Sequence, residues 1–330
     1  MRFHGLLLTR DDSDIVDECI AHALTWCDAL YVLDTGSSDD TPDRVKSWSA
    51  RDSRVVLLPR KQPPVVMNSP LRGYLFNLVR DRFEQGDWFV QQDVDEFYHV
   101  SPRDFVRDWV RREETAVYQQ NIEFRLTKQE VSRWLDGDTA IFDRRRPISA
   151  ARRHYNMVSY AEPRMFRFRR SMQWGPVSAY PWNMGYVARE RIPLRHYPHR
   201  DPLNLQLRLT LRNHLVGLTQ EGWTHWKVKD WHDFLADETS TDVFEWPDGQ
   251  QLPEVHARNH LRPFSVRCVQ YLTHGLLLPV LDRMRPQFPS NLEPDVIPPE
   301  VNAAAVQAQT ALRRGGLEGM RDNEAQQKHG

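Results

Sequence analysis

The chain has 330 residues, with 44 basic and 45 acidic side chains and a formal net charge of −1 at pH 7. This balance excludes the strongly cationic surface on which nucleic-acid binding depends, so we expect no nucleic-acid partner. The three cysteines (Cys19, Cys27 and Cys268) lack metal-binding spacing and do not form a disulfide framework. Because no segment approaches the ~18 consecutive apolar residues of a membrane span, we expect a cytoplasmic globular protein, with contact at the inner face of the membrane as a lesser expectation.

Strand and helix signals alternate through the first third of the chain. Apolar runs predict strands over residues 3–8, 29–33, 55–58 and 88–92. Capping residues and amphipathic spacing predict helices over about 15–26, from 41, over 71–85 and from 102. Strands separated by helices of this length indicate crossover connections and therefore a mainly parallel sheet flanked by helices, an α/β fold.

Polar clusters follow these predicted strands. They are Arg10 to Asp12, Asp34 to Asp40, Arg60, and Asp93 to Glu96. In parallel α/β sheets, ligands bind outside the carboxyl ends of the strands. The sequence therefore predicts one functional site at that edge of the sheet.

Two carboxylates spaced by one residue, Asp93 and Asp95, come directly after the fourth predicted strand. If the backbone stays extended there, alternate side chains share a face and the two carboxylates converge. Hard oxygen ligands of this kind suit Mg²⁺ or Mn²⁺ in a site that keeps room for substrate phosphates. The alternative is a solvated turn after the strand.

The segment Tyr31–Thr41, with Asp34 at a strand end, Gly36–Ser37, and then Asp39 and Thr41 before a helix, resembles the nucleotide-sugar site of family 2 glycosyltransferases. These enzymes have the GT-A fold, and Asp93-Val94-Asp95 resembles their D-x-D metal motif. Leu194–Arg200 resembles the end of their catalytic half, and His196 follows Asp95 by 101 residues (196 − 95). The resemblance covers about residues 3 to 215 and implies a Rossmann-like GT-A domain with a C-terminal helical extension.

The resemblance also implies roles for individual residues. Asp34 would contact the nucleobase, and Asp39 would shape the same loop. Asp93 would lie near the ribose and the metal, Asp95 would bind the metal and act in catalysis, and His196 would complete the shell around Mn²⁺ or Mg²⁺. The remaining donor-site residues implied by the resemblance are Arg10, Asn77, Arg80 and Arg200. The family's usual Arg-Asn-Glu start is replaced here by Arg10-Asp11-Asp12.

The chemistry implied is transfer of a sugar from a nucleoside diphosphate, with UDP favoured over GDP and dTDP, to a hydroxyl of a glycan, lipid-linked or protein acceptor, with inversion as the default. Such a reaction needs a general base. Glu123, Asp138 and Glu162 are candidates by position, and Glu162 is preferred because it precedes a strand-like segment. Two other functions stay open: nucleotidyl transfer on a related fold, which usually has a glycine-rich loop after the first strand that is missing here, and non-catalytic binding of a nucleotide or sugar.

The rest of the chain is less regular. Residues 144–170 hold nine arginines and one acid, Glu162, either as ion pairs or as a site for a phosphate-bearing acceptor. Asp201–Leu218 favours a helix over a strand, and Val266–Leu281 is expected to pack on the main domain, with peripheral membrane contact as the lesser alternative. We predict a catalytic domain over 1–215 (donor half 1–100, acceptor half 101–215), a Trp-rich helical extension over 216–285, which contains Trp223, Trp226, Trp231 and Trp246, and a flexible Pro-rich polar tail over 286–330.

Overall fold

The computed structural model describes residues 1–66, 70–175, 178–216, 218, 230–247, 258, 263–284 and 293–329. Contacts divide the chain into two compact units, each built from segments that are distant in the sequence: unit 1 comprises 1–121, 158–195 and 254–295, and unit 2 comprises 122–157, 196–253 and 296–330. The sequence predicts domains that follow chain order, with boundaries at residues 215 and 285. This domain division stays a prediction. Trp223 and Trp226 lie outside the described residues.

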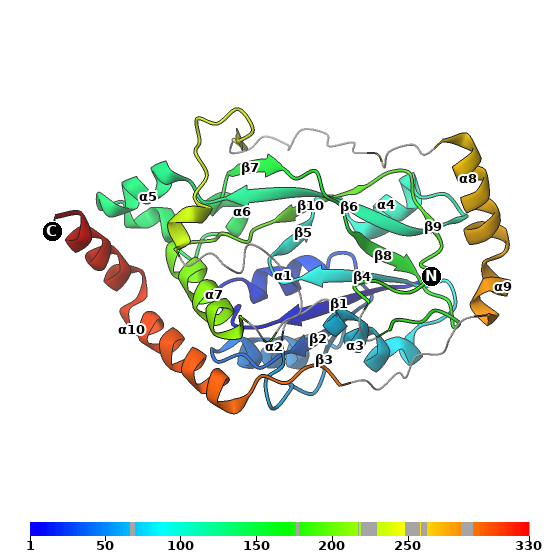
Figure 1. The fold of residues 1–330 in the computed structure, drawn as a ribbon, viewed down its shortest axis with the longest axis horizontal. Coiled ribbons are helices and arrows are strands. Elements are labelled where there is room, and N and C mark those ends of the chain that lie inside the picture. The colour runs from blue at the N-terminus through cyan, green and yellow to red at the C-terminus, as the bar shows by residue number, and fades with distance from the viewer. Residues whose placement is uncertain are drawn as a thin grey trace. The chain divides into compact units, whose positions relative to one another are not determined.

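The first unit contains the alternating strands and helices (Figure 1). Its elements are β1 (Phe3–Thr9), α1 (Val16–Ala23), β2 (Ala29–Asp34), α2 (Thr41–Arg51), β3 (Val55–Leu57), α3 (Pro70–Val79), η1 (Arg80–Arg82), β4 (Trp88–Asp93), β5 (Glu96–Tyr98), α4 (Pro102–Trp109), the first part of β6 (Glu114–Arg125), β8 (Pro163–Arg167), β9 (Tyr186–Val187), β10 (Ile192–His196, up to residue 195), α8 (Phe264–Gln270), η5 (Tyr271–Leu276) and α9 (Leu278–Arg283).

The strand order in this unit is β6-β8-β4-β1-β2-β3. The four strands β3, β2, β1 and β4 are parallel, whereas β8 pairs antiparallel with both β4 and β6. All seven residues of β1 are buried, as expected for a central strand covered on both faces. The chain moves outward from β1 to β3 and then returns to the other side of β1. Because crossovers between parallel strands are right-handed, α1 and α2 fall on one face of the sheet and α3 on the other.

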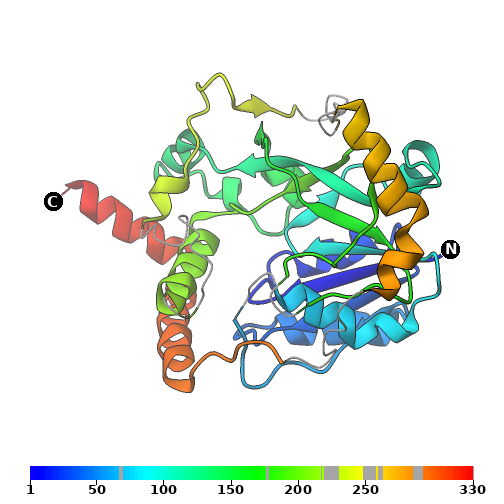
Figure 2. The same ribbon diagram turned by 45° about the vertical axis from the view of Figure 1, so that its right-hand side comes forward.

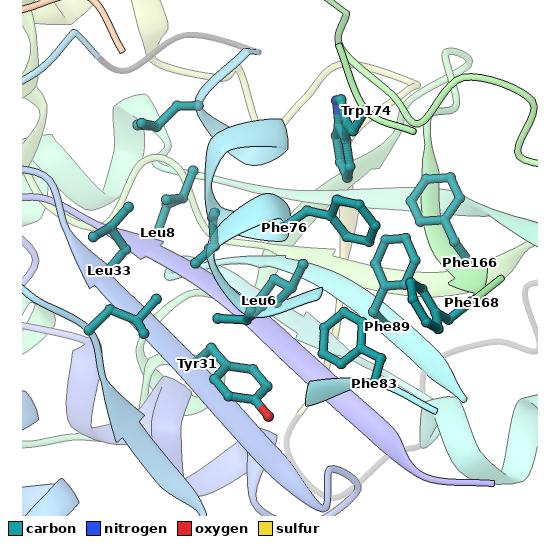
Figure 3. Close-up of a cluster of buried hydrophobic side chains, with 14 of the residues drawn as sticks. Leu6, Leu8, Tyr31, Leu33, Phe76, Phe83, Phe89, Phe166, Phe168 and Trp174 are labelled. Atoms are coloured by element: carbon teal, nitrogen blue, oxygen red, sulfur yellow. The ribbon is translucent and has the colours of Figure 1, made fainter. Parts of the chain in front are cut away.

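The core between α3 and the sheet is apolar and rich in aromatic side chains (Figure 3). Leu71, Leu75 and Val79 recur at a spacing of four along α3 and are fully or almost fully buried, which places them on one helical face. Phe89 of β4 stacks on Phe83, with ring centroids 5.9 Å apart. This packing fixes α3 against the strands, so the position of its first turn is determined by the core.

The second unit contains the second part of β6, α5 (Lys128–Leu135), η2 (Thr139–Phe142), α6 (Ile148–Ala151), β7 (His154–Met157), α7 (Pro202–Leu215), η4 (Trp231–Phe234), β11 (Phe244–Glu245) and α10 (Pro299–His329). The helix predicted over Asp201–Leu218 is present as α7, and Asp201 caps it by accepting a hydrogen bond from the Asn204 amide. The flexible tail expected over 286–330 stays a prediction; residues 299–329 are helical and form α10, which is kinked at Gly316. Leu317 and Met320 of α10 pack on a core that includes Leu205 and Leu209 of α7, which supplies the apolar burial that the tail lacks by itself.

The α/β fold predicted from the sequence, with its mainly parallel sheet flanked by helices and a C-terminal helix, is confirmed, and it is consistent with a GT-A-like architecture. The segment Val266–Leu281 contacts the rest of unit 1 on its inner side, where Tyr271 lies against Tyr186, and it leaves much of its apolar surface uncovered. Within the described part of Val266–Leu281 only Leu278 is a buried hydrophobic residue, and most of the other apolar side chains of this segment are exposed. Among the helices of the described ranges, none combines the length and apolar character needed to cross a membrane.

Candidate functional site

The carboxyl ends of β1, β2 and β4 lie side by side. Thr9 of β1 pairs with Asp34 of β2, and Leu8 of β1 pairs with Asp93 of β4. The chain order reverses between β1 and β4, which makes this point the topological switch where α/β sheets bind ligands. The site predicted from the polar clusters therefore has a defined place in unit 1.

The loops after β1 and β2 are joined by carboxylate hydrogen bonds. Asp11, whose φ of 57° is in the left-handed region, accepts from the Ser38 amide at 2.7 Å and the Ser38 hydroxyl at 2.8 Å. Asp39 accepts from the amides of Ser13 (3.2 Å) and Thr41 (3.0 Å). The carboxylates of Asp11 and Asp39 thus link the loop after β1 to the loop after β2, and the expected role of Asp39 in the donor site stays a prediction.

Asp34 is wholly buried in this arrangement. Its Oδ1 accepts from the amides of Gly36 and Ser37, both at 3.0 Å, and lies 2.9 Å from Arg60 Nε, while its Oδ2 accepts from the Ser37 hydroxyl at 2.5 Å. A carboxylate has about four acceptor sites. Four groups of the chain therefore already satisfy Asp34, and contact with a nucleobase requires one of them to be exchanged.

Arg10 is also built into the loop packing. Its guanidinium Nη1 donates to the Val65 carbonyl at 3.1 Å, and its Nε lies 3.7 Å from Asp11 Oδ2. Burial lowers the pKa of Arg10, an effect that the charges of Asp11 and Asp34 oppose. The predicted donor contact of Arg10 stays a prediction.

Asp93 lies at the centre of a charged group that we call the Asp93 cluster, formed by Arg72, Asp93, Glu96, Glu162 and Arg164. Asp93 Oδ2 is 2.5 Å from Arg72 Nη2 and 3.4 Å from Arg164 Nη1. Glu162 Oε2 lies between the same two arginines, 3.7 Å from Arg72 Nη1 and 3.6 Å from Arg164 Nη2. Glu96 Oε1 contacts Arg164 Nη2 at 2.5 Å. Three carboxylates thus share two guanidinium groups.

The cluster has a buried side and an accessible side. The side chains of Arg164 and Glu96 are 4% and 2% exposed, whereas those of Arg72, Asp93 and Glu162 are 19%, 29% and 26% exposed. Arg164 therefore holds the three carboxylates from the buried side of the cluster. Arg72, Asp93 and Glu162 are accessible to a ligand. Arg72 and Asp93 also line a small hollow beside β1 and α3.

Arg72 and Arg164 were not expected at the site from the sequence. α3 leads into β4 and runs opposite to it, so the first turn of the helix lies near the carboxyl edge of the sheet. Arg72 is in that turn, whereas Asn77 and Arg80 lie one to two turns further along. Asn77 Nδ2 donates to the Trp174 carbonyl at 3.2 Å, and Arg80 Nη2 donates to the Arg170 carbonyl at 2.9 Å. The donor role of these two side chains stays a prediction.

Asp95 differs from the expectation for an extended D-x-D segment. Val94 and Asp95 form a turn between β4 and β5, so the premise that Asp93 and Asp95 share one strand face is wrong. Asp95 is buried, and its charge acts on Cys19 of α1. Burial raises the pKa of the Cys19 thiol well above its ordinary value, and the charge of Asp95 adds to this effect.

His196 and Arg200 belong to the second unit. His196 Nδ1 lies 3.7 Å from Glu123 Oε2, and Arg200 is 4% exposed. Burial alone would raise the pKa of Glu123, but His196, Arg125 and His199 lower it to about 2. Glu123, one of the candidates for the general base, is therefore part of an ion-paired group within the second unit.

The metal site predicted from the sequence does not fit the side chains of this structure. Across the ranges that the structure describes, no three His, Cys, Asp or Glu side chains gather in a way that could hold a metal ion. Asp93 Oδ2, one of the expected ligand atoms, is instead engaged by Arg72 and Arg164. The roles of Asp93, Asp95 and His196 as ligands of Mn²⁺ or Mg²⁺ stay a prediction.

The fold and site define an α/β protein with a polar, arginine-bearing site at the carboxyl edge of its parallel strands. No protein-family model matches the chain, and no curated protein sequence matches it.

Partial structural likenesses exist. A mannosyltransferase from Pyrobaculum calidifontis in complex with GDP-Man and Mn²⁺ is 16% identical, with 41% of this chain and 38% of that protein covered and a TM-score of 0.28. Staphylococcus aureus TarS (residues 1–349) in complex with UDP-GlcNAc is 15% identical, with 38% and 35% covered and a TM-score of 0.26. A Bacillus anthracis protein assigned as a glucose-1-phosphate thymidylyltransferase, in complex with sucrose, is 12% identical, with 39% and 56% covered and a TM-score of 0.24. Each match spans less than two thirds of the other protein.

Proposed function

We propose that the chain is a glycosyltransferase that takes a sugar from a nucleoside diphosphate and transfers it to a hydroxyl acceptor. The observation that carries the proposal is the convergence of the Asp34 loop, Arg10 and the Asp93 cluster at the carboxyl ends of β1, β2 and β4. This edge of the sheet is where a nucleotide would bind in a fold of this class. The resemblance of Tyr31–Thr41 and Asp93–Asp95 to family 2 glycosyltransferases adds the donor class.

In this proposal the nucleoside lies over the loops that follow β1 and β2, with Arg10, Asp34 and Asp39 beside it and Asp93 near the ribose. The diphosphate lies next to Arg72, whose guanidinium is partly exposed. Arginine binds phosphate through two parallel donors. Negative charge grows on the diphosphate as the sugar leaves, so donors fixed in place by Asp93 and Glu162 would lower the barrier.

Glu162 is the proposed general base. Its carboxylate is partly exposed and lies 3.7 Å from Arg72 Nη1, so a base and a phosphate-binding group would be neighbours. A base of this kind takes the proton of the acceptor hydroxyl while that oxygen attacks the anomeric carbon from the side opposite the leaving diphosphate. Direct displacement in this geometry inverts the anomeric centre.

Metal dependence, and the preference for UDP, remain predictions from the resemblance. A divalent ion, when bound, offsets charge on a leaving diphosphate. The described residues do not gather the three ligands expected for it, so every step above is assigned to side chains of the chain itself. The roles of His196 and Arg200 stay predictions, as does a glycan, lipid-linked or protein acceptor.

Two alternatives have different consequences. A nucleotidyltransferase needs a loop after β1 that wraps a triphosphate, whereas here Arg10 to Asp12 has no glycine and is bonded to the next loop. A non-catalytic binding protein would need the nucleotide-binding edge but not the base.

Product analysis separates the three functions. The purified chain is incubated with UDP-, GDP- and dTDP-sugars, with Mn²⁺ and with chelator, and the products are resolved by chromatography. We expect slow release of one nucleoside diphosphate, reduced at least about tenfold in Glu162→Gln, with Glu113→Gln as a matched control at another acidic position. Formation of a nucleoside triphosphate and a sugar 1-phosphate when pyrophosphate is added would establish nucleotidyl transfer, run in reverse. Binding of a nucleotide sugar without turnover, even with candidate acceptors, would establish the binding protein.

A further inference from the structure

Helices α8, η5 and α9 form a segment with an unusual surface. Nine apolar side chains of this segment are between 37% and 77% exposed: Phe264, Val266, Val269, Tyr271, Leu272, Leu276, Leu277, Val280 and Met284. We call this set the apolar face. The segment occupies the right-hand edge of Figure 1 and comes forward in Figure 2. Soluble proteins rarely expose large contiguous apolar patches without using them.

The segment is fixed to unit 1 by its inner side. Asp282 of α9 is buried, and it accepts from Arg169 Nε at 3.0 Å, from the Ser171 hydroxyl at 2.5 Å and from Asn183 Nδ2 at 3.0 Å. Leu278 is buried beside it. Polar contacts therefore hold these helices in place, and the apolar side chains project outward from a firmly anchored segment.

The exposed formal charges of the segment are all positive. Residues 263–284 contain three residues with formal charge, of which Arg267 and Arg283 are exposed and Asp282 is turned inward. An outward face that combines aliphatic and aromatic side chains with arginines alone is the composition of a helix that lies in the headgroup region of an anionic membrane. No helix of the described ranges can span a bilayer, so the contact would be peripheral.

We propose that the apolar face of α8, η5 and α9 binds the surface of an anionic phospholipid bilayer, with the apolar side chains in the headgroup–acyl boundary and Arg267 and Arg283 at the phosphates. A second copy of the chain is a poorer occupant. In a two-fold symmetric interface the same patch meets itself, which would bring arginines together with no exposed acid of the segment to neutralise them. The proposal stands independently of glycosyl transfer, since it uses other residues and needs no substrate.

Vesicle co-sedimentation of the full chain tests this inference without any donor or acceptor. Vesicles of phosphatidylcholine alone are compared with vesicles that also contain phosphatidylglycerol, at low and high salt. We expect binding to the anionic vesicles that weakens as salt rises. The double variant Leu272→Glu/Leu276→Glu should bind at least about tenfold more weakly, because two apolar side chains no longer enter the boundary. Arg267→Gln should weaken binding to the anionic vesicles about fivefold.

Leu78→Glu on α3 is the matched control, because Leu78 is 46% exposed and lies outside the segment. Its binding should equal that of the wild type, and circular dichroism checks that each variant is folded. Wild-type protein that stays in the supernatant with both kinds of vesicle would overturn the proposal. Sedimentation equilibrium gives the second contrary result: a dimer that Leu272→Glu/Leu276→Glu disperses would show that a second copy covers the face.

Discussion

Replacing Arg164 with methionine removes a charge from the buried side of the Asp93 cluster while keeping a similar chain length. The Arg164 guanidinium is within 3.6 Å of carboxylate oxygens of Asp93, Glu96 and Glu162. Asp93 and Glu162 are partly exposed, but the Glu96 side chain is 2% exposed and has little access to water. Removal of one partner of a buried ion pair typically costs about 3–5 kcal/mol, because the other charge is left uncompensated. Against a total stability of about 5–15 kcal/mol, this loss is large.

The assay is guanidinium or thermal denaturation of the wild type, Arg164→Met, Glu96→Met and the double variant, followed by circular dichroism. We expect Arg164→Met to lower the midpoint strongly and the double variant to recover much of the loss, since neither charge then remains unpaired. Nucleotide binding should stay weakened in the double variant, because Asp93 and Glu162 have lost the group that orders them. An Arg164→Met protein within about 0.5 kcal/mol of the wild type would refute this reasoning, as would a double variant no more stable than the worse single variant.

Three further predictions follow from other features of unit 1. Arg72→Gln removes a partly exposed ion pair, so we expect a stability change below about 1 kcal/mol but at least about tenfold weaker nucleoside-diphosphate binding by calorimetry, and equal affinity would contradict the phosphate role. Gly36 has φ 113°, and a Cβ there would lie 2.5 Å from Pro64 Cβ. Gly36→Ala should therefore destabilise by about 1–3 kcal/mol and weaken nucleotide binding, whereas an unchanged melting temperature would show that the loop relaxes at no cost. Burial lowers the pKa of His22 from 6.5 to about 4. The unfolded chain takes up the proton first, so the stability that is present above pH 6.5 falls by about 3 kcal/mol as the pH drops towards 4. His22→Phe should flatten this part of the melting temperature–pH curve, and an unchanged curve would contradict the assignment.

The parallel strands could be predicted because each is specified by a short apolar run in its own stretch of sequence. The apolar runs at 3–8, 29–33, 55–58 and 88–92 became β1 to β4 with shifts of one residue at most. The helix predicted from residue 102 is present as α4, and Ser101 caps it by accepting a hydrogen bond from the Asp104 amide. The carboxyl-edge rule then placed the polar clusters correctly, because in a parallel sheet it depends only on strand direction.

The accessory strands and half of the site could not be predicted because they depend on distant partners. β8 joins β4 and β6 through antiparallel pairing that no local pattern specifies. This pairing brings Arg164 under Asp93, 71 residues away in the sequence. The turn at Val94–Asp95 takes Asp95 off the extended strand that ends at Asp93. The burial of Leu317 and Met320 of α10 depends on a core that includes residues of α7. Glu162, chosen for its position before a strand, does lie beside the arginines that hold Asp93.

Calorimetric titration with UDP, GDP and dTDP, each with Mn²⁺ and with chelator, tests the central claim most directly. We expect one of these nucleotides to bind, and its affinity to fall at least about tenfold in Asp93→Asn, which loosens the cluster that would hold the diphosphate. Asp108→Asn, at an exposed position on α4, should bind like the wild type. Binding that requires Mn²⁺ would add the predicted metal to the site. No binding of any nucleotide under either condition would contradict a nucleotide-sugar site at this edge of the sheet.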